Sequence, residues 1–347
     1  MALIQPVVGI TMGDPAGIGP EIVIKAMGSP DVRSACRPMV IGDSRVFEKA
    51  LVGEKIALPV RVISSFGGAD WDSGALHVLD TGNADPEKIE IGKPSASGGK
   101  AVFEDIQRAV ELSREGQISG IVAGPHNKYS VNLAGVSFAG YPPLIAKLTG
   151  SPHAFNMLVS GSVRVVGATL HLALKDVCRA ISKDLVLATV EAVQQGLNRL
   201  GISRPRIAVA GLNPHCGEQG LFGTEEETAI GPAIESAKRK GIDVYGPYPA
   251  DSLFAGLGEK PPFDAYVAMY HDQSHIPIKT IAFDSIAGLI IGTPLVIATV
   301  GHGTAFEIAG KGRANPRPMK EAIQLVSRSC GAQSSSPLLP NSLARSK

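Results

Sequence analysis

The stretch "KDLVLATVEAVQQGLNRLGISRPRIAVAGLN", residues 183–213, contains the two patterns that decide the fold of this chain. Residues 183–201 place apolar side chains at helical spacing and end at a glycine, which predicts an amphipathic helix. Residues 206–213 contain an apolar run directly after Arg206, which predicts a strand buried on both faces. Such alternation of helix and buried strand is typical of α/β proteins.

The same alternation extends outward along the chain. Residues 98–116 and 225–241 also have helical periodicity and end at glycine. Short apolar runs rich in β-branched residues predict further strands over 7–10, 37–42, 60–63, 120–125, 163–170, 266–271 and 295–301. We therefore expect an α/β fold with a largely parallel sheet, in which ligands bind beyond the carboxyl ends of strands.

Composition limits the kind of partner. A chain of 347 residues is longer than a single hydrophobic core usually accommodates, so about two domains are expected. The 33 basic and 32 acidic residues give a net charge of +1, so the composition lacks the excess of basic residues typical of proteins that bind nucleic acid or anionic membranes. The sequence has no secretory signal pattern, no apolar run near the ~20 residues that cross a bilayer, and no C-x-x-C motif. We expect a cytoplasmic protein that acts on a small molecule.

Three predicted strands end in polar residues that include a histidine. His171 follows residues 163–170, His215 follows Asn213 and Pro214, and His271 follows Tyr270. Neutral imidazole is a common ligand of Zn²⁺, and catalytic sites use three protein ligands with one open position. The three histidines therefore predict a metal site, although no short sequence motif contains all three and each could be an ordinary loop or core histidine.

The late segment "GHGTAFEIAGKGRANPRPMKEAI", residues 301–323, resembles the adenosine-binding loop of isopropylmalate and isocitrate dehydrogenases. Small residues at this loop would allow backbone N–H groups to approach a nucleotide. His302 could stack on or bond to adenine, and Glu307 could accept from ribose hydroxyls. The predicted cofactor is NAD or NADP, and its predicted contacts are His302, Gly303, Thr304, Ala305 and Glu307.

Residues 7–325 as a whole resemble the 4-hydroxythreonine-4-phosphate dehydrogenase family of vitamin B6 biosynthesis. The matching stretches are "ITMGDPAGIGPEI", "AGPHNK", "ATLHLALKDV", "GLNPHCGEQGLFGTEE", "ADSLF", "AMYHDQSHIPIK" and "GHGTAFEIAGKG". The resemblance implies an isocitrate/isopropylmalate-dehydrogenase-like two-domain fold and a homodimer with a shared active site. It places the family's metal ligands on His171, His215 and His271, and its substrate lysine on Lys279.

The expected domains follow from this resemblance. Residues 1–130 and 285–330 would form a discontinuous nucleotide-binding domain, and residues 131–284 a domain for metal, substrate and dimerisation. Residues 331–347 are rich in Ser and Pro without periodicity, which predicts a disordered tail.

Three departures from the family pattern concern the substrate. Tyr141-Pro142 stands where phosphate-using members have a His-Thr pair, Gly288 replaces an asparagine, and Ile297 replaces an arginine. Isoleucine cannot clamp a phosphate as arginine does. The pattern resembles the terephthalate cis-dihydrodiol dehydrogenase branch, so we expect a cis-dihydrodiol carboxylate or related hydroxy acid. The alternatives are 4-hydroxythreonine phosphate and threonate or erythronate 4-phosphate.

One chemistry fits all these substrates. A divalent ion, Zn²⁺ or else Co²⁺, Ni²⁺, Mg²⁺ or Mn²⁺, would lower the pKa of the reacting hydroxyl, hydride would pass to nicotinamide, and CO₂ would leave. The candidate bases are Lys279, which we favour, Asp251 and Asp272; further candidate substrate contacts are Tyr141, Asn213 and His275. The alternatives from other classes are a metal-dependent hydrolase or acyltransferase without a redox cofactor, and a non-catalytic metabolite-binding protein.

Overall fold

The computed structural model describes residues 5–63 and 69–333, and its strands form one 12-stranded sheet. The strands are β1 Val7–Thr11, β2 Arg37–Gly42, β3 Val60–Ile63, β4 Leu76–Asp80, β5 Gly120–Ala123, β6 Phe155–Ser160, β7 Val163–Gly167, β8 Ile207–Ala210, β9 Val244–Tyr248, β10 Ala265–Ala268, β11 Ala287–Ile291 and β12 Ile297–Val300. Their order across the sheet is β3-β4-β2-β1-β5-β12-β11-β6-β7-β10-β8-β9.

The sheet consists of two parallel blocks. One contains β3, β4, β2, β1, β5 and β12, and the other contains β7, β10, β8 and β9. Between them, β11 and β6 pair antiparallel with each other and with their outer neighbours, so the two blocks run in opposite directions. The prediction of an α/β fold with a largely parallel sheet is confirmed.

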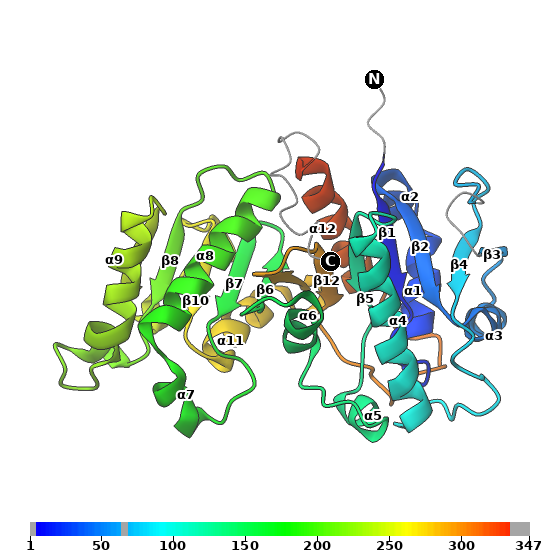
Figure 1. Cartoon of the computed structure of the whole chain (residues 1–347), viewed down its shortest axis with the longest axis horizontal. Helices are drawn as coiled ribbons and strands as arrows, with labels where there is room; N and C mark the ends of the chain where they lie inside the picture. Colours follow the sequence, from blue (N-terminus) through cyan, green and yellow to red (C-terminus); the bar gives the residue numbers. More distant parts are fainter. Residues whose placement is uncertain (1–4, 64–68, 334–347) are drawn as a thin grey trace, which may run out of the picture.

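Helices cover both faces of this sheet (Figure 1). They are α1 Gly19–Met27, α2 Pro30–Ala35, α3 Ser44–Glu54, α4 Ala96–Arg114, α5 Lys128–Leu133, α6 Tyr141–Thr149, α7 Leu174–Ala180, α8 Lys183–Arg199, α9 Gly231–Arg239, α10 Ala250–Leu253, α11 His271–Ala282 and α12 Arg317–Gln333, with short turns η2 Pro214–Gly217, η3 Glu226–Ile230 and η4 Phe283–Ser285.

The three predicted helices are confirmed. Residues 98–116 correspond to α4, and residues 183–201 to α8. Both begin at a serine whose hydroxyl accepts from a backbone N–H of the first turn: Ser95 caps α4 and Ser182 caps α8. Residues 225–241 form the π-helical η3 followed by α9.

The apolar side chains form one continuous cluster on one face of the sheet and two separate clusters on the other. Buried residues of α1, α3, α8, α9 and α12 belong to the continuous cluster. On the opposite face, one cluster gathers α4 and α6 around β5 and β12, and the other gathers α11 around β7 and β10. The gap between these two clusters leaves the centre of the sheet available for a polar site.

The central strands cross the predicted domain boundary, because β11 of the segment 285–330 pairs with β6 of the segment 131–284. The domain division itself stays a prediction. Residues 331–333 end α12 instead of beginning a tail, and the rest of the predicted tail lies outside the described residues. Among the described helices, none is both long and apolar enough to cross a membrane.

Candidate functional site

An open cavity of about 580 Å³ lies over the centre of the sheet, between the two smaller clusters. Its floor is formed by Asn156 and Leu158 of β6, Gly288 of β11 and Thr299 of β12. Its walls come from α11, from the segments after β5, β7 and β12, and from the start of α6. The cavity is therefore built by segments from distant parts of the chain.

Helix α11 brings three polar side chains to this cavity. His271, His275 and Lys279 are spaced four residues apart, so they lie on one side of the helix, and all three line the cavity. The rings of His271 and His275 stack with centroids 3.9 Å apart. The sequence places a strand up to His271, whereas β10 ends at Ala268 and His271 begins a helix.

His171 lies opposite α11, in the segment between β7 and α7. Its ring centroid is 6.1 Å from that of His271, so the structure brings two of the three predicted metal ligands together. Burial, with the charges of Lys128 and His271, lowers the pKa of His171, which favours the neutral imidazole that a metal requires. His271 Nδ1 lies 2.7 Å from Asp272 Oδ1, which leaves Nε2 of His271 free for a ligand.

The third predicted ligand, His215, lies outside this cavity in a single chain. It is exposed in η2 after β8, and the predicted residues Asn213 and Asp251 are also absent from the cavity lining. Within residues 5–63 and 69–333, no three His, Cys, Asp or Glu side chains are close enough to hold one metal ion. The donor chemistry of His171 and His271 fits a divalent ion, but one chain brings only two of the three predicted ligands to this cavity.

The loop that carries His215 is held by a buried carboxylate. Glu226 Oε1 accepts hydrogen bonds from the backbone N–H groups of Leu212 and Asn213, both at 2.7 Å, and Oε2 accepts from Asn213 Nδ2 at 2.9 Å. His215 and Cys216 have positive φ values of 54° and 56°, which non-glycine residues rarely adopt. The Glu226 contacts keep this unusual turn in place.

Gln273 links the same loop to α11. Its Oε1 accepts from the backbone N–H of Met269 at 2.6 Å, and its Nε2 donates to the carbonyl of Gly211 at 2.9 Å. Gln273 therefore ties the carboxyl end of β8 to the segment that begins α11.

His126 and Lys128 were not among the predicted site residues, yet both line the cavity. His126 packs edge-on against Tyr141, with ring centroids 4.3 Å apart, and burial lowers its pKa to about 4. Lys128 Nζ lies 3.0 Å from His171 Nε2, and burial lowers its pKa as well. The available signal was their position in "AGPHNK", directly after the buried strand β5.

Two of the substrate-specific positions differ from expectation. Tyr141 lines the cavity with its ring, but its hydroxyl is buried and donates to the carbonyl of Gly124 at 2.9 Å. Ile297 is fully buried in the apolar cluster that contains α4 and α6 and does not line the cavity, whereas Thr299, two residues later on the same face of β12, does. Tyr141 can therefore offer a substrate only an apolar surface.

Part of the predicted cofactor loop reaches the same cavity. His302, Gly303 and Thr304 line it, whereas Ala305 is half-buried and Glu307 is exposed outside the lining. Thr304 packs against Gly17, where a Cβ atom would lie only 2.8 Å from Thr304 Cβ. This close approach requires glycine at position 17 and explains the glycine-rich start of the chain as tight packing.

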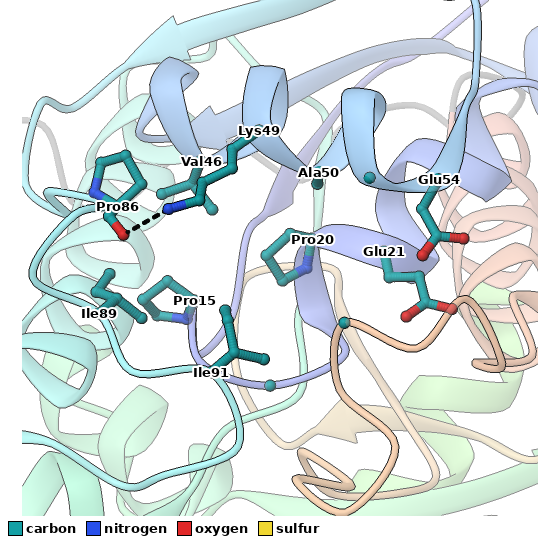
Figure 2. A pocket seen from close by; sticks show the side chains of 13 residues that line it. Pro15, Pro20, Glu21, Val46, Lys49, Ala50, Glu54, Pro86, Ile89 and Ile91 are labelled. Carbon is teal, nitrogen blue, oxygen red and sulfur yellow. Dashed lines mark hydrogen bonds between the residues drawn. The ribbon is translucent and has the colours of Figure 1, made fainter.

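A second, smaller cavity of about 240 Å³ is lined in part by Gly17 and by Gly310 of this loop (Figure 2). Figure 2 shows Pro15, Pro20, Ile89 and Ile91 around it, with Glu21 and Glu54 side by side at one end. Its lining is mostly apolar, and it shares no described residue with the first cavity.

An ion cluster beside the second cavity holds the end of the cofactor loop. Lys25 Nζ lies 2.6 Å from Glu21 Oε1 and 3.0 Å from Glu54 Oε2, and it donates to the carbonyl of Gly312 at 3.0 Å. Glu21 Oε1 also accepts from the backbone N–H of Ala314 at 2.7 Å. These contacts fix residues 312–314 to α1 and α3.

Comparisons with known proteins agree with this architecture. A D-threonate 4-phosphate dehydrogenase from Cupriavidus necator is 46% identical over 324 residues, which are 92% of this chain and 96% of the relative. A crystal structure of a 4-hydroxythreonine-4-phosphate dehydrogenase from Burkholderia phymatum is 40% identical with a TM-score of 0.81, covering 94% of this chain and 99% of that one.

A terephthalate 1,2-cis-dihydrodiol dehydrogenase from Burkholderia xenovorans LB400 is also similar, with 33% identity and a TM-score of 0.65 over 93% of this chain and 98% of that chain. The family model described as pyridoxal phosphate biosynthetic protein PdxA matches residues 34–326. The chain therefore belongs to the PdxA family, whose similar members named above are all dehydrogenases.

Proposed function

We propose that this protein is a divalent-metal- and NAD(P)-dependent dehydrogenase that oxidises a secondary hydroxyl of a phosphorylated hydroxy acid, with decarboxylation. The observation that carries the proposal is the cavity over the central strands, which gathers His171, His271, two lysines and the start of the cofactor loop. The named relatives are dehydrogenases, which supports an enzyme that removes hydride from the carbon that carries an alcohol group.

Each group of cavity residues has a separate proposed role in this reaction. His171 and His271 would hold the ion, which supplies Lewis acidity to the reacting hydroxyl, while the dinucleotide at His302 to Thr304 supplies the hydride acceptor. Lys279 remains our candidate base, because of the three predicted bases it alone lines the cavity; Asp272 pairs with His271 and Asp251 is remote. The ring of Tyr141 and the aliphatic side chain of Leu158 limit the access of water.

A second copy of the chain would complete the metal site. In one chain, His215, Asn213 and Asp251 form one group and the cavity residues another. Large apolar side chains are exposed near both groups, which supports an interface there; they are Leu172, Leu174, Leu221, Phe222, Ile276 and Phe283. A homodimer in which His215 reaches the partner's cavity accounts for both observations.

The substrate we now favour is the alternative, phosphorylated one. The sequence favoured a cis-dihydrodiol carboxylate because three positions depart from the phosphate-using pattern. One of them, Ile297, does not line the cavity, whereas Lys128 and Lys279 do. Two ammonium groups suit a substrate that carries both a carboxylate and a phosphate. The 46% identical relative is named for D-threonate 4-phosphate, which has both groups. We therefore propose threonate 4-phosphate or a close analogue as the substrate.

The test is turnover by purified, metal-loaded protein with NAD⁺ or NADP⁺, followed by absorbance of the reduced cofactor. We expect threonate 4-phosphate to react in preference to 4-hydroxythreonine phosphate and to a terephthalate cis-dihydrodiol. Selective turnover of the dihydrodiol would restore the interpretation based on Ile297. Hydrolysis or acyl transfer without any cofactor reduction would overturn the dehydrogenase assignment.

The shared metal site has its own test. Metal binding is measured for His171→Ala, His215→Ala and an equimolar mixture of the two after joint refolding. Each single variant should lose tight metal binding, and the mixture should recover part of it in heterodimers. No recovery, with a monomer by sedimentation, would contradict the shared site.

A further inference from the structure

The floor of the cavity contains a carboxamide that the function described so far does not use. Asn156 lies on β6, and its side chain extends across the neighbouring strand β11 to lie over Gly288. A Cβ atom on residue 288 would be 2.5 Å from Asn156 Oδ1 and 3.1 Å from Thr299 Cγ2. Any side chain at position 288 would therefore displace the carboxamide, so glycine there makes room for Asn156.

The carboxamide is also unsatisfied. Asn156 Oδ1 is buried and has no hydrogen-bond partner within the described part of the chain, which is costly for a carbonyl oxygen. The side chain lines the same cavity as Lys279, His171 and His271. A polar group that is positioned by close packing but lacks a partner is typical of a site that a ligand completes.

We propose that Asn156 is a substrate-binding, specificity-determining residue that recognises the hydroxyl of the substrate that is not oxidised. Rotation about the Cβ–Cγ bond exchanges the two ends of a carboxamide, so the group can either accept or donate. A hydroxyl can meet either end, whereas a phosphate or carboxylate oxygen can only accept. In threonate 4-phosphate this would be the 2-hydroxyl beside the carboxylate. The inference rests on the proposed function, because it assumes that this cavity holds the substrate.

The experiment compares two substrates across the same variants. Metal-loaded wild type and Asn156→Ala are assayed with threonate 4-phosphate and with its 2-deoxy analogue. Asn156→Ala should lower kcat/KM for threonate 4-phosphate about 10- to 100-fold. It should leave kcat/KM for the deoxy analogue within about two-fold of the wild-type value. The control is Ser160→Ala on the same strand, whose hydroxyl bonds to Ser285 outside the cavity and should matter equally little for both substrates.

A second comparison moves the carboxamide to the neighbouring strand. Gly288→Asn alone should lower kcat/KM for threonate 4-phosphate, because its side chain collides with Asn156. Asn156→Gly combined with Gly288→Asn relieves that collision and returns one carboxamide to the same space. The double variant should therefore be more active than either single variant, an outcome that a purely structural role for Asn156 would not give.

The outcomes separate this inference from the proposed function. If wild type reduces no cofactor with any of the acids named above, the proposed function fails and this inference fails with it. If wild type is active but Asn156→Ala lowers kcat/KM equally for both substrates, or for neither, only the inference fails. Direct calorimetric binding of threonate 4-phosphate to each variant gives a readout independent of turnover.

Discussion

Lys128 Nζ lies 3.0 Å from Nε2 of His171, the ring nitrogen that points toward the cavity wall opposite α11. An ammonium group so close to a proposed metal ligand competes with a cation for the same lone pair. The lowered pKa values of both groups have burial as their largest cause. Metal loading and the position of Lys128 are therefore expected to depend on each other.

Replacing Lys128 by Met should strengthen metal binding and weaken substrate binding. Removal of the positive charge favours a divalent ion at His171 by about 3- to 30-fold, the order of a single like-charge interaction near a protein surface. The same change removes one of the two ammonium groups available to the substrate, so KM for threonate 4-phosphate should rise. Calorimetric metal titration and steady-state kinetics check the two effects, with the exposed Lys100→Met as the control.

Glu226→Gln should loosen the loop that carries His215. The buried carboxylate accepts from two backbone N–H groups and from the side chain of Asn213. In glutamine, an NH₂ group would replace one of the two accepting oxygens, and its N–H donors would face the donors that this oxygen now accepts from. We expect a loss of about 1–3 kcal/mol in the free energy of unfolding and weaker metal binding. Urea denaturation and metal titration measure these. The exposed neighbour Glu227→Gln should change neither, and an equal effect at both positions would contradict the assignment.

The sequence predicts the fold better than the site, for physical reasons. All eight predicted strands are present, because strands buried on both faces are continuous apolar runs. Four strands were missed: β4, β6, β9 and β11. Two of these, β6 and β11, are the antiparallel strands that form the cavity floor, and their polar or small residues Asn156 and Gly288 acquire meaning only through cross-strand pairing.

The candidate site shows the same limit. The strand-end rule pointed to His171 and His271, and the family resemblance pointed to Lys279; the structure places all three at one cavity. His215 followed the same rule but lies elsewhere in one chain, because its loop is held by Glu226 and turns through positive φ values. A sequence rule that places ligands at strand ends cannot tell which ends belong to one chain and which to a partner.

Lys25→Met should weaken dinucleotide binding without changing metal binding. Lys25 holds the carbonyl of Gly312 and orients Glu21, which accepts from the N–H of Ala314, so its loss frees the end of the loop after His302. Because all three side chains of the cluster are largely buried, the variant also leaves two carboxylates unpaired. We expect KM for NAD(P)⁺ to rise about 10-fold with kcat less affected. The exposed Lys88→Met should leave KM for the cofactor unchanged.

The buried Asp105 should make stability depend on pH. Burial raises its pKa to about 8, against the lowering effect of its bonds from Asn83 and Thr81, so the folded protein keeps the carboxyl protonated where the unfolded chain ionises it. A raised folded pKa gives stability that is full below the unfolded value of 3.8 and is lost as pH rises to about 8.

Asp105→Asn keeps the acceptor Oδ1 and replaces the buried Oδ2 by an uncharged group. The stability difference between Asp105→Asn and wild type should therefore grow between pH 4 and 8 and become constant above that range. Denaturant unfolding across this range measures it, with the half-exposed Asp85→Asn as the control, and parallel pH profiles for wild type and Asp105→Asn would show that Asp105 is already ionised in the folded protein.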